Sequence, residues 1–186
     1  MKLFAITPDN ATVGQLIDRL PELQNLGAAY LYIRLSASGR QLRPLIDAAA
    51  VAGIVPIVSY MFYTRDLLSS CGVHYKSSEI SLLAQGLPSP PRVITASSHS
   101  SVDARLALQA GANYAYVSPV YEPLSKHGDR HRLFPRDELQ KLVTMHAERI
   151  VLLGGMTTQR IEELAMDFGC DFSAAGITLF FDALGG

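Results

Sequence analysis

Gly111-Ala-Asn-Tyr-Ala-Tyr116 opens the stretch that decides the fold, because two variants of this phrase occur elsewhere in the chain. They are Gly27-Ala-Ala-Tyr-Leu-Tyr32 and Gly169-Cys-Asp-Phe-Ser-Ala174. In each phrase a glycine that can end a helix in the left-handed conformation stands just before an apolar run of strand length. The repeat therefore predicts a helix-to-strand connection that recurs along the chain.

Outward from these phrases, eight short apolar runs alternate with segments of helical period. The runs cover residues 2–7, 29–34, 55–59, 72–75, 92–96, 113–118, 149–153 and 171–176. Continuous apolar strands are typical of a parallel sheet that is covered on both faces. The alternation predicts an α/β fold with a single domain over residues 1–186: a compact (β/α)₈ or TIM barrel with shortened helices. A flavodoxin-like open sheet would need fewer strands and is the weaker alternative.

Capping residues predict where two of the helices begin. Ser100 and Asp103 have the spacing of a capping box, and Thr157 or Thr158 can cap the helix that follows the Gly154-Gly155 pair. Both starts come directly after a predicted strand, as the alternation requires.

The composition is that of an ordinary globular protein, with 48% apolar residues, 18% charged residues and a net charge of −1. No basic excess favours a nucleic-acid partner. The most apolar window, residues 45–62, contains Asp47, Gly53 and Pro56, so a helix, a turn and a strand explain it better than a membrane span. Cys71 and Cys170 lack metal-ligand spacing and indicate free thiols, so we expect a cytoplasmic protein. The oligomeric state is left open, and a homodimer is compatible with the sequence.

Polar and small residues gather where the predicted strands end, which in a (β/α)₈ barrel is the face that carries the active site. The Gly154-Gly155 turn offers backbone N–H groups and the positive end of a helix dipole to an anion. The loop after the neighbouring strand is either a solvated surface loop or a second anion-binding element. It carries Ser125, Lys126, His127, Arg130, His131 and Arg132. These features predict an enzyme of phosphorylated small molecules, whereas motifs for proteolysis, nucleotide hydrolysis and hydride transfer are missing.

Each remaining candidate residue has a structural alternative. Arg34 can bind a carboxylate or phosphate bidentately, or form a salt bridge at the rim. Ser97 and His99 lie in a hydroxyl-rich strand end that suits pyrophosphate oxygens or simply begins the next helix. His74 lies inside a strand, where a packed core histidine is the commoner case. Glu79 can bind Mg²⁺ or favour the first turn of a helix.

Several short motifs resemble, in order and spacing, those of the thiamine-phosphate synthase and thiazole tautomerase family of small (β/α)₈ barrels. They are Gly72-Val73-His74, Ser97-Ser98-His99-Ser100, Gly111-Ala-Asn-Tyr114, Ser118-Pro119-Val120-Tyr121, Ser125-Lys126 and Gly154-Gly155-Met156. The resemblance covers most of the chain and is strongest from Cys71 onward. It implies a transferase of thiamine biosynthesis. Its substrates would be small phosphorylated molecules, a hydroxymethylpyrimidine diphosphate and a thiazole phosphate, and its products thiamine phosphate and pyrophosphate.

The resemblance also implies roles for individual residues. The catalytic contacts with the diphosphate would come from Arg34, Ser97 and Lys126, with Ser125 assisting. Phosphate binding would further involve Gly154, Gly155, Gly176, Ile177 and His99. Mg²⁺ would be the cofactor, and Glu79 would be its ligand.

Three departures from the family pattern affect the diphosphate site. The second strand, Tyr32-Ile-Arg34-Leu-Ser36, lacks the family's Gln and Lys, Ser59-Tyr60 replaces an Asn-Asp pair, and Ser78-Glu79 replaces an acidic pair. Two further functions therefore stand beside the synthase. One is a thiazole phosphate tautomerase, in which His99, His127 or His74 would act as acid and base because Pro119 occupies the family's histidine position. The other is a non-catalytic relative that binds a phosphate ligand.

Overall fold

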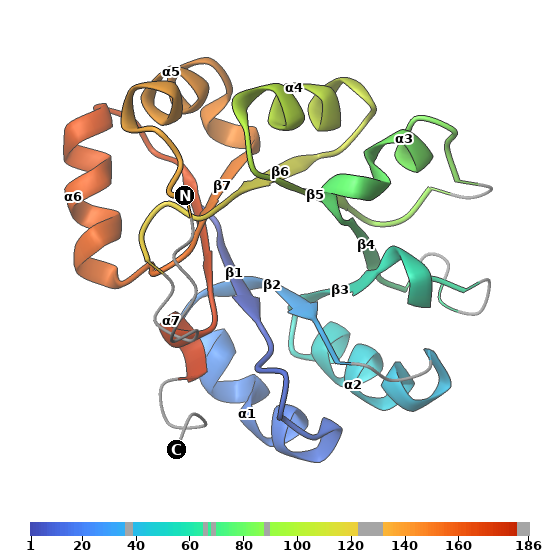
Figure 1. Ribbon diagram of the computed structural model, residues 1–186. Coiled ribbons are helices and arrows are strands. Elements are labelled where there is room, and N and C mark those ends of the chain that lie inside the picture. Colours follow the sequence, from blue (N-terminus) through green and yellow to red (C-terminus); the bar gives the residue numbers. More distant parts are fainter. Residues whose placement is uncertain (36–38, 65–66, 68–69, 88–89, 123–131, 182–186) are drawn as a thin grey trace.

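Eight parallel strands pair in chain order, and β1 closes the ring against β8 (Figure 1). The computed structural model describes residues 1–35, 39–64, 67, 70–87, 90–122 and 132–181. The strands are β1 (Leu3–Ile6), β2 (Ala28–Ile33), β3 (Val55–Ser59), β4 (Gly72–Tyr75), β5 (Ile94–Ser98), β6 (Tyr114–Val117), β7 (Ile150–Leu153) and β8 (Ser173–Gly176). The expected (β/α)₈ barrel is therefore confirmed.

Helices lie around the outside of the strand ring (Figure 1). The α-helices are α1 (Val13–Asn25), α2 (Gly39–Val51), α3 (Ile80–Leu83), α4 (Ser101–Gln109), α5 (Arg136–His146), α6 (Thr158–Phe168) and α7 (Thr178–Phe181). Short 3₁₀ turns are η1 (Tyr60–Phe62), η3 (Ser77–Glu79) and η4 (Ala147–Arg149). The expected shortening is confirmed, because β3 leads into η1, and α3 and α7 have four residues each. No described helix has the length and apolar character that crossing a bilayer requires.

Local sequence signals account for the helix ends. The Ser100 hydroxyl accepts a hydrogen bond from the Asp103 amide at 3.0 Å, and Thr157 caps α6 in the same way. Gly169 ends α6 with φ +64°, the left-handed conformation that glycine adopts without steric cost. The capping and repeat-phrase expectations are thus confirmed at these positions.

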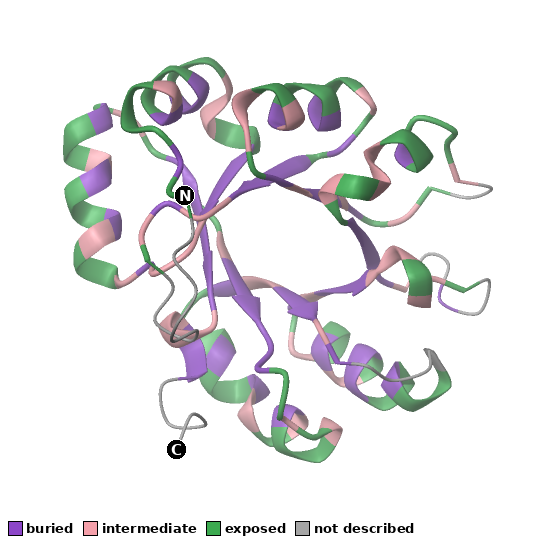
Figure 2. Cartoon of the chain, in the orientation of Figure 1, coloured by how far each residue is buried: buried purple, intermediate pink, exposed green. Residues whose placement is uncertain are grey.

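Side chains on each strand alternate between the barrel interior and the helix layer. On β6, Tyr114 and Tyr116 belong to the interior cluster, whereas Ala115 and Val117 pack with the outer helices. The strands are buried, while the helices expose their outer faces (Figure 2). The interior is rich in aromatic rings, including a stacked pair of Phe4 and Tyr30 with centroids 4.3 Å apart. A filled interior leaves the two barrel mouths as the places where polar side chains can meet a ligand.

The fifth strand differs from the sequence expectation. It was expected over residues 92–96, with the serines that follow at the strand end or beginning the next helix, but β5 runs from Ile94 to Ser98. Ser97 pairs in register with Tyr116, and Ser98 with Val117. The physical reason is that strand pairing satisfies the backbone of these serines, although their hydroxyls resemble loop or cap residues in sequence.

Candidate functional site

The C-terminal ends of the strands form one mouth of the barrel, and Arg34 lies at its rim just after β2. The Arg34 backbone N–H donates to the Thr7 hydroxyl at 2.9 Å, which joins the ends of β1 and β2. Its guanidinium contacts the Asp9 carboxylate at 2.8 Å and 2.7 Å. The structure therefore shows the rim salt bridge, and phosphate binding by Arg34 stays a prediction.

Ser97 and His74 are joined directly near the same mouth. The Ser97 hydroxyl oxygen lies 2.8 Å from His74 Nε2, and His74 Nδ1 lies 2.8 Å from the Thr95 hydroxyl oxygen. His74 is buried, and burial, followed by the positive charges of Arg34 and Lys76, lowers its pKa from 6.5 to about 3. The imidazole is therefore neutral at physiological pH. Of the three hydrogen-bonded side chains, half-buried Ser97 lies nearest to solvent.

Aromatic side chains surround the imidazole. The Tyr32 ring centroid lies 4.3 Å from that of His74, and the Tyr116 centroid lies 5.1 Å away. The Tyr32 hydroxyl is 3.0 Å from the Ser59 hydroxyl at the end of β3. Burial raises the pKa of Tyr32, so its phenol stays protonated. This central part of the mouth is thus polar but uncharged.

The Gly154-Gly155 turn after β7 packs closely against the segment that follows β6. The two glycines have φ +103° and +58°. A Cβ on Gly154 would lie 2.9 Å from Pro119 Cα, and one on Gly155 would collide with the Glu122 carbonyl oxygen. The Gly154 carbonyl accepts from the Tyr121 amide at 3.2 Å. Loop packing alone therefore requires both glycines, and phosphate binding at this turn stays a prediction.

Two other predicted phosphate sites lie at the same end of the barrel. Exposed His99 donates from Nδ1 to the Ser118 carbonyl at 3.0 Å, which links the segments after β5 and β6. Gly176 is the buried last residue of β8. The carbonyl of Ile177 accepts from the first turn of α7, with the Phe180 amide at 3.0 Å. All of these residues have structural partners, and nothing among them tests a phosphate role.

Glu79 is used at the start of a helical turn. Its Oε2 accepts from the Lys76 backbone N–H at 2.8 Å. In the described part of the chain, no group of three His, Cys, Asp or Glu residues is placed to hold a metal ion. At the family's other acidic position, Tyr60 stacks on Tyr75 with centroids 4.7 Å apart. Among the described residues, Glu79 is therefore engaged within its own turn, and its role as a ligand of Mg²⁺ stays a prediction.

Ser125 and Lys126, with His127, Arg130 and His131, lie outside the described residues. Arg132 is described and exposed. The sequence did not single out Thr95 and Tyr116, and it named Tyr32 only as part of the strand that lacks the family's Gln and Lys. The two-residue alternation along each strand is the signal that could have found them, because Thr95 pairs in register with inward-facing His74.

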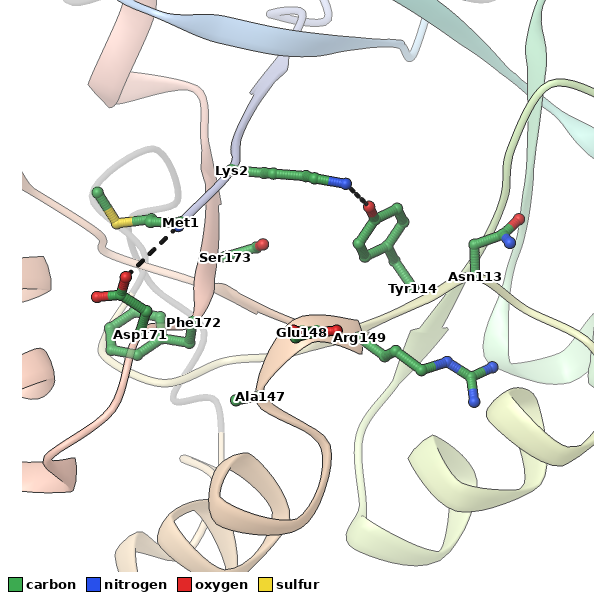
Figure 3. Close-up of a pocket in the computed structure, with 10 residues that line it drawn as sticks. All are labelled: Met1, Lys2, Asn113, Tyr114, Ala147, Glu148, Arg149, Asp171, Phe172 and Ser173. Carbon is green, nitrogen blue, oxygen red and sulfur yellow. Dashed lines mark hydrogen bonds and ion pairs between the residues drawn. The ribbon is translucent and has the colours of Figure 1, made fainter.

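The described residues also line a cavity of about 750 Å³ at the opposite mouth, around the starts of β1, β6, β7 and β8. In Figure 3, Lys2 reaches across this opening to the Tyr114 hydroxyl, and the Met1 ammonium pairs with Asp171. The Lys2 ammonium also lies 5.2 Å from the centre of the Tyr114 ring. These residues lie at the N-terminal strand ends, which in this fold serve stability rather than chemistry.

Comparisons with known structures agree with this architecture. Thiamine phosphate pyrophosphorylase from Pyrococcus furiosus superposes with a TM-score of 0.70 at 21% identity, covering 95% of this chain and 85% of that one. A 3-hexulose-6-phosphate synthase gives 0.62 at 10% identity, covering 100% and 94%. The N-acetylmannosamine-6-phosphate 2-epimerase from Clostridium perfringens gives 0.60 at 13% identity, covering 96% and 87%. At these identities the likeness shows the fold alone.

Sequence comparison identifies the family. No curated protein matches the chain. The family model described as thiamine monophosphate synthase, however, matches residues 3–178, from the first strand of the barrel to the start of α7. The matched region contains the whole C-terminal mouth. This chain therefore belongs to the thiamine monophosphate synthase family.

Proposed function

We propose that this chain is a transferase of the thiamine-phosphate synthase type. In that reaction the ring nitrogen of a thiazole phosphate forms a bond to the methylene carbon of hydroxymethylpyrimidine diphosphate. The bond from that carbon to the diphosphate oxygen breaks, and its electron pair leaves with pyrophosphate. The observation that carries the proposal is Ser97, half-buried at the C-terminal mouth of a barrel of this family.

The surroundings of Ser97 support a site for uncharged heterocycles. Tyr32, Tyr116 and the neutral imidazole of His74 are buried close together, and they would give the floor of the mouth beside Ser97 an aromatic and uncharged character. Such surfaces suit the flat faces of pyrimidine and thiazole rings. The phosphate groups would then extend toward the rim, where Arg34 lies and where Lys126 is expected.

A pyrophosphate-release assay with hydroxymethylpyrimidine diphosphate and thiazole phosphate tests the proposal. We expect release only when both substrates are present, and strong loss of turnover in Ser97→Ala. Ser98→Ala is the matched control, because Ser98 is the neighbouring strand residue but is buried. Absence of pyrophosphate release at any Mg²⁺ concentration would reject the transferase.

The described mouth also favours a second candidate, a thiazole phosphate tautomerase. Such an isomerase needs no metal, only a proton-transferring group beside the ring, and the described mouth offers the imidazole of His74 and the hydroxyl of Ser97. Turnover of a thiazole phosphate tautomer without added metal, and without any pyrimidine substrate, would support it. Binding of thiazole phosphate with neither activity would instead identify a non-catalytic relative.

A further inference from the structure

We propose that Thr95 and His74 hold the Ser97 hydroxyl as a hydrogen-bond acceptor toward the C-terminal mouth. Ser97 would then receive an N–H group of a heterocyclic ligand rather than a phosphate oxygen. This inference rests on the proposed function only in taking the C-terminal mouth as the ligand site. It departs from the sequence expectation, in which Ser97 contacts the diphosphate.

The direction of the hydrogen bonds begins at Thr95. The Thr95 hydroxyl donates to the Val73 carbonyl at 3.4 Å, and a carbonyl can only accept. With its proton directed there, Thr95 offers lone pairs to His74 Nδ1, 2.8 Å away, and to the Tyr116 hydroxyl, which also interacts with Thr95 and can donate to it. In this arrangement His74 Nδ1 carries the proton of the neutral imidazole.

The same direction continues to Ser97. A neutral imidazole has one N–H, so His74 Nε2 is left as an acceptor. The Ser97 hydroxyl lies 2.8 Å from this nitrogen and donates its only proton to it. His74 and Thr95 are both buried in the barrel, so the contact between them is closed to water. What Ser97 presents to the mouth is therefore the lone pairs of its oxygen.

An acceptor at this position selects ligands by their chemistry. A phosphate oxygen finds no proton on Ser97 and would face its lone pairs. An amino group or a ring N–H finds a matched partner. The neighbouring groups do not reverse this preference, since the tyrosines around His74 are uncharged and burial keeps the imidazole neutral. Thr95 and His74 are thus positioning residues, and Ser97 is the group that touches the ligand.

The tautomer of His74 can be measured by ¹⁵N NMR on uniformly labelled protein. The chain has five histidines, so His74→Gln assigns the signal. We expect a protonated Nδ1 and an unprotonated Nε2 in the wild-type protein, and an altered or mixed tautomer in Thr95→Val. A proton on Nε2 of the wild-type protein would overturn the proposal, because Ser97 would then be free to donate.

Binding of small probes gives an independent readout. 4-Aminopyrimidine carries N–H donors, 4-methoxypyrimidine lacks them, and inorganic phosphate tests the sequence expectation. We expect Ser97→Ala to lower the affinity for 4-aminopyrimidine about 3- to 10-fold, the usual effect of losing one hydrogen bond. The other two probes should bind as before, and Ser98→Ala should change none of them. Weakened phosphate binding with unchanged 4-aminopyrimidine binding would contradict the proposal.

The two experiments also separate this inference from the proposed reaction. If the pyrophosphate-release assay fails but the Nδ1 tautomer and the probe preference are found, the transferase is rejected and the role of Ser97 stands. If the assay shows turnover but NMR places the proton on Nε2 of His74, the transferase stands and this inference is rejected.

Discussion

The guanidinium of Arg34 is bound by the carboxylate of Asp9, with Nη2 at 2.8 Å from Oδ1 and 2.7 Å from Oδ2. The exposed fractions of the two side chains are 31% and 69%. An ion pair this exposed contributes little to stability. Its consequence is for ligand binding, because the carboxylate occupies Nη2, one of the donors that Arg34 could offer to a phosphate.

Removing the carboxylate should therefore make Arg34 available to anions. We expect Asp9→Asn to raise the affinity for pyrophosphate several-fold, measured by isothermal titration calorimetry, and to leave the melting temperature nearly unchanged. Asp47→Asn is the control, because it weakens a similar Arg–Asp pair within α2. Equal pyrophosphate affinity in wild type and Asp9→Asn would show that the Asp9 carboxylate does not limit anion binding at Arg34.

The protein should become less stable as the pH is lowered, because of His74. In the unfolded chain its pKa is near 6.5, whereas burial lowers the folded pKa to about 3. Between these values the unfolded chain binds a proton that the folded chain does not, so the unfolding free energy drops as pH falls. The slope from this residue approaches about 1.4 kcal/mol per pH unit. Urea unfolding at several pH values should give a shallower dependence in His74→Gln, and parallel curves would contradict the expectation.

Gly155 should be intolerant of any side chain. Its φ of +58° disfavours other residues, and a Cβ would meet the Glu122 carbonyl oxygen. We expect Gly155→Ala to cost about 1–3 kcal/mol, seen as a lower melting temperature. Gly14→Ala is the control. Gly14 lies in α1 with nothing within 4 Å of an added Cβ, so this variant should be as stable as the wild type or more stable. A Gly155→Ala protein as stable as wild type would show that the two loops can move apart.

The two cysteines should differ in reactivity. Cys71 is buried, its thiol donates to the Leu67 carbonyl at 3.6 Å, and burial raises its pKa to about 12. Cys170 is half-buried. Because the thiolate is the reactive form, iodoacetamide should label Cys170 in the folded protein and Cys71 only after unfolding. Peptide mass spectrometry measures this, and equal labelling rates would indicate that the region around Cys71 opens readily.

Lys126 lies outside the described residues, and its role rests on the sequence. We expect Lys126→Ala to weaken binding of pyrophosphate about tenfold or more, because a point charge is removed from beside an anion. Lys141→Ala, on exposed α5, is the matched control for loss of one positive charge. Unchanged affinity in Lys126→Ala would remove this residue from the anion site.

The pattern of the chain was enough to predict the barrel. Gly27, Gly111 and Gly169 all adopt positive φ, and a strand follows each of them, as the repeated phrase indicated. These signals are local: a helix end, a cap or an apolar run depends on residues a few positions apart. The sequence did not predict that β5 extends to Ser98, because serines favour loops and caps unless a neighbouring strand satisfies their backbone.

The partners of the polar side chains were decided only by the tertiary structure. Arg34 and Asp9 are 25 positions apart, and His74 and Ser97 are 23 apart. Each pair meets because two neighbouring strands are in one particular register, and a shift of one residue would turn the inward side chains outward. The sequence by itself therefore determined the order of elements and the end of the barrel where polar groups gather. The closed sheet decided which of those groups bind one another and which still face a ligand.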